Sequence, residues 1–171
     1  MICPSCGHVN VPGADECSQC LFPLASVDAN PTGQDAVEES VLHDLVRKLK
    51  PKPMVTIPED GTLGLALDRM VEHGVGALLV VDKNDKLAGI LTERDYLKKV
   101  IGLIDDYARL PLRDHMTRDP ETVTPDDPLG LAVQKMDVGG YRHLPVVEDG
   151  KPVGIISVRD VIRHLTRLCN T

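Results

Sequence analysis

Residues 51–171 contain one sequence pattern twice, and this internal duplication limits the possible folds more than any other feature. Matching residues lie 66 positions apart in the first part of each copy and 65 apart after a hairpin turn, as in Leu63 with Leu129, Met70 with Met136, and Gly89 with Gly154. The first copy covers 51–108 and the second 109–171. Neither copy is long enough to close a core well alone, so the two are expected to pack together.

Each copy predicts the element order strand, helix, strand, strand, helix. The first helix has apolar residues at helical spacing from Leu63 or Leu129 onward, and a glycine follows it. The other elements are an extended stretch (54–58; 122–125), two strands joined by a tight turn (77–81 and 87–91; 144–147 and 153–156) and a last helix (95–104; 160–168). The predicted fold class is therefore α/β, built from two β-α-β-β-α repeats.

The last strand of each copy runs into a shared motif, Gly-aliphatic-aliphatic-hydroxyl-x-Arg-Asp, at 89–95 and 154–160. One interpretation is a capping box, in which Thr92 or Ser157 caps the helix and Asp95 or Asp160 reaches back to the cap amide. The other is a nucleotide grip, because a helix N-terminus with a hydroxyl binds anions and an adjacent carboxylate accepts both ribose hydroxyls. The repetition of the motif favours the second interpretation.

Four cysteines near the N-terminus form two Cys-x-x-Cys pairs, Cys3 with Cys6 and Cys17 with Cys20. Zinc prefers four such thiolates in a tetrahedron, and in so short a segment metal binding would supply the folding energy. Two disulfides or a redox dithiol are the alternatives. Residues 1–25 closely resemble the short zinc ribbons of prokaryotic regulatory proteins, except that Leu21 stands where a glycine is common, which leaves the tightness of that turn open.

The charge distribution argues against nucleic-acid binding by this ribbon. The net charge is −7, and residues 1–46 contain seven Asp or Glu but no Lys or Arg. Phosphate binding requires basic residues, so contact with a protein partner or a purely structural role remains. No apolar run reaches the roughly 20 residues of a membrane span, and the N-terminus does not read as a signal peptide. The chain is expected to be cytoplasmic, without membrane or nucleic-acid contacts.

Residues 26–50 are predicted to form a linker and a leading helix. Ser26 to Gly33 is small and polar, as flexible connectors are. Asp35 is then expected to cap a helix whose apolar stripe continues to Leu49, before Lys50-Pro51-Lys52-Pro53 ends it.

The duplicated body is similar to a tandem pair of cystathionine-β-synthase (CBS) domains, the Bateman module. The two Gly-to-Asp motifs carry the resemblance, together with His115-Met116-Thr117 and the stretch 140–147. The resemblance implies one cleft with Thr56, Ala77, Thr92 and Asp95, and a second with Val123, His143, Ser157 and Asp160, while Arg94, Arg142 and Arg159 are placed to assist with phosphates. The second site matches the pattern more fully, because Met116-Thr117 precedes its repeat and Lys-Pro-Lys-Pro precedes the first.

The same resemblance implies a regulatory protein that binds AMP, ADP, ATP or an adenosine derivative such as S-adenosylmethionine. A homodimer is expected through apolar helix positions at Leu97, Val100, Ile101, Val161, Ile162 and Leu165, with the zinc ribbon contacting an unknown protein partner. No P-loop, nucleophile elbow or paired carboxylates occur, so no enzyme activity is expected. Two alternatives stay open: His143 could be a structural cleft wall, and the chain could be an interaction module with structural clefts and a docking ribbon.

Overall fold

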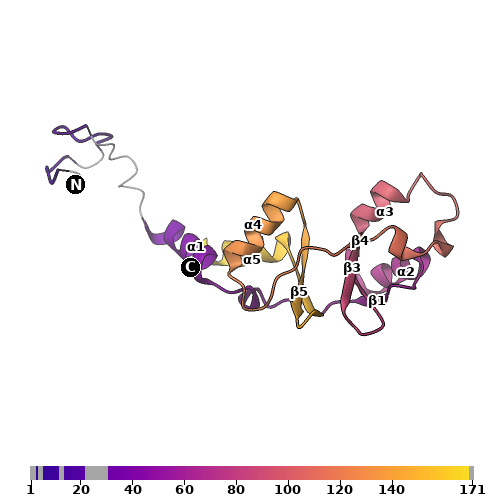
Figure 1. The fold of residues 1–171 in the computed structure, drawn as a ribbon. Coiled ribbons are helices and arrows are strands. Elements are labelled where there is room, and N and C mark those ends of the chain that lie inside the picture. Colours follow the sequence, from indigo (N-terminus) through magenta and orange to yellow (C-terminus); the bar gives the residue numbers. More distant parts are fainter. Residues whose placement is uncertain (1–2, 4–5, 12–13, 22–30, 170–171) are drawn as a thin grey trace.

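The computed structural model describes residues 3, 6–11, 14–21 and 31–169 of the chain. Each sequence copy forms its own helix-and-sheet unit with its own apolar core (Figure 1). The first core centres on residues such as Ile57, Leu78 and Leu91. The second centres on Val123, Leu144 and Ile156. The duplication read from the sequence is therefore a duplication of packed units.

The first unit has a four-stranded sheet in the order β1-β2-β3-β4. Its elements are β1 (Thr56–Pro58), α2 (Leu63–His73), β2 (Ala77–Val81), β3 (Leu87–Thr92), α3 (Glu93–Lys99) and β4 (Thr117–Arg118). β1 runs parallel to β2, and the other neighbouring strands are antiparallel. The buried run of β2, with all five residues inaccessible, explains why this strand could be located from its apolar sequence alone.

The second unit repeats this plan with fewer strand residues. It contains α4 (Leu129–Gly139), β5 (His143–Glu148), β6 (Lys151–Ser157) and α5 (Val158–Cys169). The hairpin β5–β6 has a register shift between Val146 and Val147, at the position that matches the shift between Val80 and Val81 in the first unit. The strand predicted at 122–125 is reduced to a single parallel bridge from Val123 to Val146.

The helix ends follow the predicted signals in three of four cases. Gly74 and Gly140 end α2 and α4 with left-handed φ angles of 60° and 64°, which confirms the expected glycine stops. α5 ends one residue beyond its predicted bound. The helix predicted to 104 instead ends at Lys99, because Val100 turns into the core and Gly102 takes a φ of 75°. No helix in the described residues is long and apolar enough to cross a membrane.

The leading segment differs from its prediction. α1 spans Pro31–His43, so it begins before Asp35 and includes residues expected in the linker. A short 3₁₀ helix at Val46–Leu49 follows after a break. The break arises because the backbone at Asp44 and Val46 bonds to the second unit: the Leu129 amide donates to the Asp44 carbonyl and the Val46 amide to the Asp127 carbonyl.

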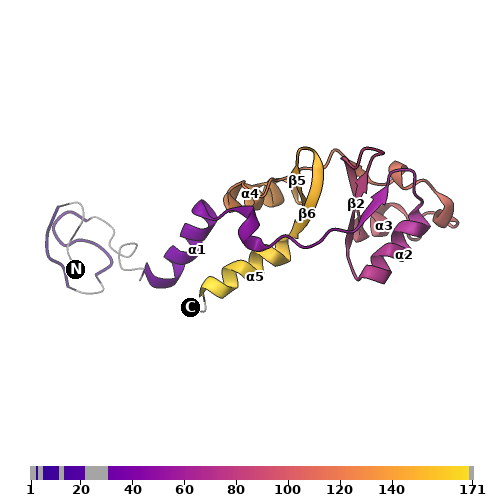
Figure 2. The same cartoon turned by 90° about the horizontal axis from the view of Figure 1, so that it is seen from below.

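The segments that lead into the two copies are exchanged between the units. α1 packs on α4 and α5 of the second unit, not on the first unit that it precedes (Figure 1, Figure 2). Residues 107–109, at the boundary between the copies, pack on α2 of the first unit. Two helical glycines allow this close approach, because a Cβ on Gly130 would meet the Val41 carbonyl oxygen at 2.9 Å and one on Gly64 would meet that of Ala108 at 2.8 Å.

The exchange continues at the strands of the shared motif. Lys52 forms a two-bond bridge with Ile155 of β6, and Thr117 pairs with Ile90 of β3. The motif glycines make room for these strands. A Cβ on Gly154 would lie 2.8 Å from Cβ of Pro51, and one on Gly89 would lie 2.6 Å from the Met116 sulfur.

The two units meet through a small apolar cluster and one further backbone bond. Buried Ala77, Leu79 and Ile90 of the first sheet pack with Met54, Leu87 and Ile155, the last from the second unit. The Leu87 amide donates to the Gly150 carbonyl at 3.0 Å. The chain from Lys52 to Thr56 thus runs from β6 of one unit to β1 of the other.

The apolar positions proposed for a dimer face are only partly available. Val100 and Val161 are buried in the cores of their own units, and Leu165 packs against the second core. Leu97, Ile101 and Ile162 remain exposed. Helical spacing identified the apolar stripe correctly, but it did not separate the core-facing residues from the outward-facing ones.

We expect Gly154→Ala to destabilise the protein by about 1–3 kcal/mol, because the added Cβ collides with Pro51 and strains the Lys52 bridge. Without that collision, alanine in a strand would stabilise by roughly 0.5–1 kcal/mol, so the sign of the change is decisive. Denaturant unfolding measures it, with the exposed Lys151→Ala on the same strand as control. A stabilised Gly154→Ala variant would contradict the close packing of the exchanged segment.

Candidate functional site

The motif carboxylate of the first unit has two distinct oxygens. Oδ2 of Asp95 accepts hydrogen bonds from the backbone amide and the hydroxyl of Thr92, at 2.9 and 2.7 Å. Oδ1 points the other way and forms an ion pair with Nζ of Lys99 at 2.7 Å. The capping interaction predicted as one interpretation of the motif is thus present, and it uses only one of the two oxygens.

The second unit repeats this arrangement at Asp160. Its Oδ2 accepts from the amide and hydroxyl of Ser157 at 3.0 and 2.5 Å, and its Oδ1 contacts Nζ of Lys52 at 2.9 Å and the guanidinium of Arg163 at 3.3 Å. Burial raises the pKa of this carboxyl, but the hydrogen bonds from Ser157 and Lys52 and the Lys52 charge outweigh it, so the pKa lies below its ordinary value. Asp160 is therefore ionised at neutral pH.

The exchange of leading segments changes which residues belong to each cleft. Lys52, at the start of the first copy, contacts Asp160 of the second. The carbonyl of His115, near the start of the second copy, accepts a hydrogen bond from Lys99 beside Asp95 of the first. The sequence-based preference for the second site assumed that each leading turn serves its own repeat, and the structure reverses that assumption.

Several predicted site residues lie at the mouth of these motifs. Ala77 pairs directly with Thr92 at the start of β2, and His143 pairs with Ser157 at the start of β5. The arginines Arg94, Arg142 and Arg159 are all exposed near the helix starts. The Arg142 carbonyl accepts from the first amide of α5, as the Gly76 carbonyl accepts from that of α3.

Thr56 and Val123 do not occupy equivalent places. The Thr56 carbonyl accepts from Arg69, and the matching bond in the second unit runs from Lys135 to the Thr122 carbonyl. The structural counterpart of Thr56 is therefore Thr122. Val123 is buried in the second core, and its amide and carbonyl both bond to the β5 strand. Thr56 lies in an open cavity of about 550 Å³ with Met54, Arg69 and His73 among its lining.

His143 lies between the two motifs. Burial is the main reason that its pKa is lowered, and the charges of Arg159 and Lys52 act in the same direction, against the opposing charges of Glu93 and Asp160. Glu93 belongs to the first unit and Asp160 to the second, so acidic side chains of both units act on His143. A mostly neutral imidazole here can donate or accept a hydrogen bond, which fits either a cleft wall or a ligand contact.

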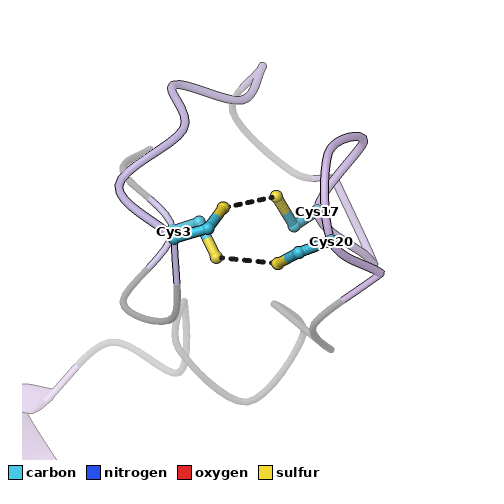
Figure 3. Close-up of side chains that lie close together, drawn as sticks. Cys3, Cys17 and Cys20 are labelled. Carbon is cyan, nitrogen blue, oxygen red and sulfur yellow. Dashed lines mark hydrogen bonds between the residues drawn. The ribbon is translucent and has the colours of Figure 1, made fainter.

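The four N-terminal cysteines converge in space. Their sulfur atoms all lie within 4.8 Å of one another, and the Cys3–Cys20 and Cys6–Cys17 sulfur pairs are each 3.7 Å apart (Figure 3). A thiolate tetrahedron with bonds of about 2.3 Å to zinc has edges of about 3.8 Å, whereas a disulfide requires about 2.05 Å. All four thiols are free. The donor set fits zinc and does not fit two disulfides.

The surroundings of Cys17 favour a thiolate. Burial raises the pKa of this thiol, but hydrogen bonds from the Gln19 and Cys20 amides and from Asn10 lower it to about 6. The turn that follows is formed despite the absence of glycine: Leu21 takes a φ of 58°, close to the 75° of Gly7 at the matching position. Both residues donate their amide to the first cysteine carbonyl of their own pair, at 2.9 Å.

Sequence reasoning missed a polar cluster that joins α1 to α5. Nε2 of His164 contacts the Ser40 hydroxyl at 2.9 Å and Oδ2 of Asp44 at 3.1 Å, and Lys48 pairs with the other Asp44 oxygen at 2.7 Å. Serine, histidine and aspartate are the residues of a hydrolase triad. A triad, however, uses the two imidazole nitrogens for different partners, and here one nitrogen serves both. No local spacing connects residues 120 positions apart, so only the fold reveals this clamp.

The clamp predicts an acid-sensitive attachment of α1. Burial raises the pKa of Asp44, but Lys48, Ser40 and His164 lower it to about 2, against an ordinary value of 3.8. Because the folded pKa is depressed, the stabilisation is complete above pH ~4 and is lost as the pH falls towards 2. We expect Asp44→Asn to destabilise by about 1–3 kcal/mol at pH 7 and to match the wild type near pH 2. Asp126→Asn, at an exposed ion pair with Arg47, should change little.

Comparison with known proteins agrees with this duplicated architecture. The family model of the CBS domain matches residues 44–102 and again 112–167. A relative from Arabidopsis thaliana, the CBS domain-containing protein CBSCBSPB5, is 39% identical over 138 residues. That alignment covers 81% of this chain but 25% of the plant protein, so the chain spans about a quarter of this relative's length.

Two similar solved structures contain bound ligands. The CBS domain protein PAE2072 from Pyrobaculum aerophilum, complexed with AMP, aligns with a TM-score of 0.63 at 26% identity, covering 72% of this chain and 98% of that one. The CBS domain pair of protein MJ0100, in complex with 5′-methylthioadenosine and S-adenosyl-L-methionine, aligns with a TM-score of 0.64 at 27% identity, covering 72% and 96%.

Proposed function

The chain belongs to the CBS-domain family and carries two CBS domains in tandem, and from this we propose that it is a regulatory protein that binds an adenosine-containing ligand. The observation that carries the proposal is that the two oxygens of each motif aspartate make different contacts. In both units Oδ2 caps the helix and Oδ1 faces outward to a lysine. A carboxylate oxygen held in a fixed direction, and paired only with flexible cationic side chains, is available to ribose hydroxyls.

Each proposed cleft combines residues from both leading segments and strands. The first has Thr92, Asp95, Arg94 and Ala77 with the His115–Thr117 turn, and Thr56 stands at its edge. The second has Ser157, Asp160, Arg159, Arg142 and His143 with Lys52, while Val123 would act only by supporting β5. Similar proteins complexed with AMP and with S-adenosyl-L-methionine support this ligand class. Adenine nucleotides and S-adenosylmethionine are therefore the ligands to test.

Regulation would arise from the exchanged segments. A ribose on Asp160 displaces Lys52, and Lys52 belongs to the strand that bridges β6 and leads into β1 of the other unit. A ligand that binds better to one arrangement of the two units shifts the population towards it. Ligand binding would thus affect the relative position of the two units through the side chain of Lys52 and its backbone bridge to β6.

We expect Asp160→Asn to weaken binding of the preferred nucleotide about 10- to 150-fold, which corresponds to the 1.5–3 kcal/mol of a charged hydrogen-bond acceptor. The asparagine oxygen can still cap α5 through Ser157, so stability should change by less than about 1 kcal/mol. Asp160→Ala is a poorer test, because it also removes both capping bonds.

Isothermal calorimetry with AMP, ADP, ATP and S-adenosylmethionine measures the effect, with the exposed Asp137→Asn as control. Absence of heat and of any thermal shift with all four ligands on the wild type would refute nucleotide sensing. The docking-module alternative, with structural clefts, would then replace it.

The N-terminal cysteines are proposed to hold one structural zinc ion through Cys3, Cys6, Cys17 and Cys20. The amide bonds to the Cys17 sulfur would orient this ligand and offset its charge. We further propose a cytoplasmic homodimer without catalytic activity, in which the acidic ribbon contacts a protein partner and neither nucleic acid nor membrane. Free thiols suit a reducing compartment, and exposed Leu97, Ile101 and Ile162 suit a dimer face.

Elemental analysis of protein purified without chelator should find one zinc per chain. Cys17→Ser should release the metal, while the CBS pair, with cores of its own, keeps its unfolding transition. Cys169→Ser provides the control, since this exposed cysteine lies on α5 outside the cluster. A metal-free wild type, or equal zinc loss in both variants, would rule out the four-cysteine site.

A further inference from the structure

A cationic cleft extends along α5 from the second motif aspartate. It has a volume of about 200 Å³, and its lining comes from the exchanged leading segment and from successive turns of α5: Lys48, Leu49, Lys50, Lys52, Asp160, Arg163, His164 and Arg167. Five of these eight residues are lysine or arginine, and Asp160 is the only acid among them. The cleft begins where the proposed ribose site ends.

The positive charge of this cleft is only partly neutralised. Asp160 pairs with Lys52 and Arg163, and Asp44 pairs with Lys48 from outside the lining. Among the side chains that the structure describes, no carboxylate forms an ion pair with Lys50 or Arg167. Two carboxylates thus face five cations, and the excess charge is open to an anion.

The first unit has fewer cations at the positions that match this cleft. Ile155 and Ile90 occupy the same position in the two motifs, so their bridge partners, Lys52 and Thr117, are equivalent residues of the two units. In this correspondence a threonine, Thr117, replaces Lys52, and Gly102 replaces Arg167. Duplication preserved the aspartate and the hydroxyl in both units. The first unit has Lys98, Lys99 and Arg113 where the second has Arg163, His164 and Lys48, but it has no cation at the positions of Lys50, Lys52 and Arg167.

We propose that this cleft binds the phosphate chain of a nucleotide whose ribose is held by Asp160, so that the second site selects nucleoside di- or triphosphates over monophosphates. The inference rests on the proposed function and deepens it. From Asp160 to Arg167 the helix rises about 10 Å at 1.5 Å per residue. A single phosphate stays near the helix start, beside the exposed Arg159, whereas further phosphates reach Lys50, Arg163 and Arg167.

Ligand binding would give new partners to Asp160, Lys52 and Arg163, so that no charged group is left unpaired. The ribose hydroxyls take over Oδ1 of Asp160, and the released Lys52 and Arg163 turn to the phosphate oxygens, with which charge-assisted hydrogen bonds form. Lysine suits this role because its charge sits on a flexible stem. A nucleoside without phosphates would displace the same two cations from Asp160 but would offer them no anionic group in its place.

The test uses full-length protein carrying Asp95→Asn, so that one nucleotide site remains, and compares AMP, ADP and ATP by calorimetry at low salt without divalent cations. We expect ATP to bind at least about tenfold more tightly than AMP. The double variant Lys50→Gln and Arg167→Gln should bring this ratio close to one and leave AMP affinity within about twofold, since neither residue contacts Asp160. ATP binding should also weaken more steeply with salt than AMP binding.

The control is Lys98→Gln with Arg113→Gln, which removes the same total charge from the first unit and should leave the ratio unchanged. Equal affinities for AMP and ATP would overturn this inference while nucleotide sensing stands, and no binding of either would overturn both. If the control variant lowered the ratio equally, the preference for ATP would come from the long-range field of all the protein's charges and not from this cleft, which would also overturn the inference. Binding of inorganic tripolyphosphate that ignores both Asp160→Asn and added adenosine would show a separate anion site, and would also overturn it.

Discussion

The two backbone bridges between the units, Lys52 with Ile155 and Thr117 with Ile90, are the interactions on which the rest of the structure depends. They pair the approach to each CBS domain with the motif strand of the other. This contact requires glycine at both motif positions, because a Cβ on Gly89 or Gly154 would collide with the segment that pairs there. Each cleft is consequently a product of both repeats, and neither repeat can form its cleft alone.

In each motif aspartate the structural role and the proposed binding role would belong to different oxygens of one carboxylate. One oxygen closes the N-terminus of the helix and fixes the orientation of the group, as a capping box does. The other oxygen, held by that cap, faces a lysine delivered by the chain outside the motif in the second unit and by the helix itself in the first. The cap therefore preorganises the acceptor, and the two interpretations of the motif are complementary rather than exclusive.

The two proposed sites differ in the charged side chains that pair with their motif aspartates. Asp160 pairs with Lys52 from the exchanged segment and with Arg163 of α5, whereas Asp95 pairs with Lys99 of its own helix. The cap geometry of the motif is the same in both units, so differences in ligand preference would come from the charges around each aspartate and from the longer helix α5. The clamp of Ser40, Asp44 and His164 secures α1 beside the cationic cleft and keeps the leading segment in place.

The sequence by itself determined the repeat, the strands β2, β3, β5 and β6 to within a residue or two, the glycine helix stops and the convergence of four cysteines. These features depend on local periodicity, turn chemistry and ligand spacing, which a short window of residues contains. Only the tertiary structure decided that α1 breaks at His43, that Val100 and Val161 face inward, that Thr122 matches Thr56, and that Lys52 serves Asp160. Each of those outcomes depends on contacts between residues far apart in the chain, whose pairing is set by the packing of two similar units and leaves no periodic trace in either.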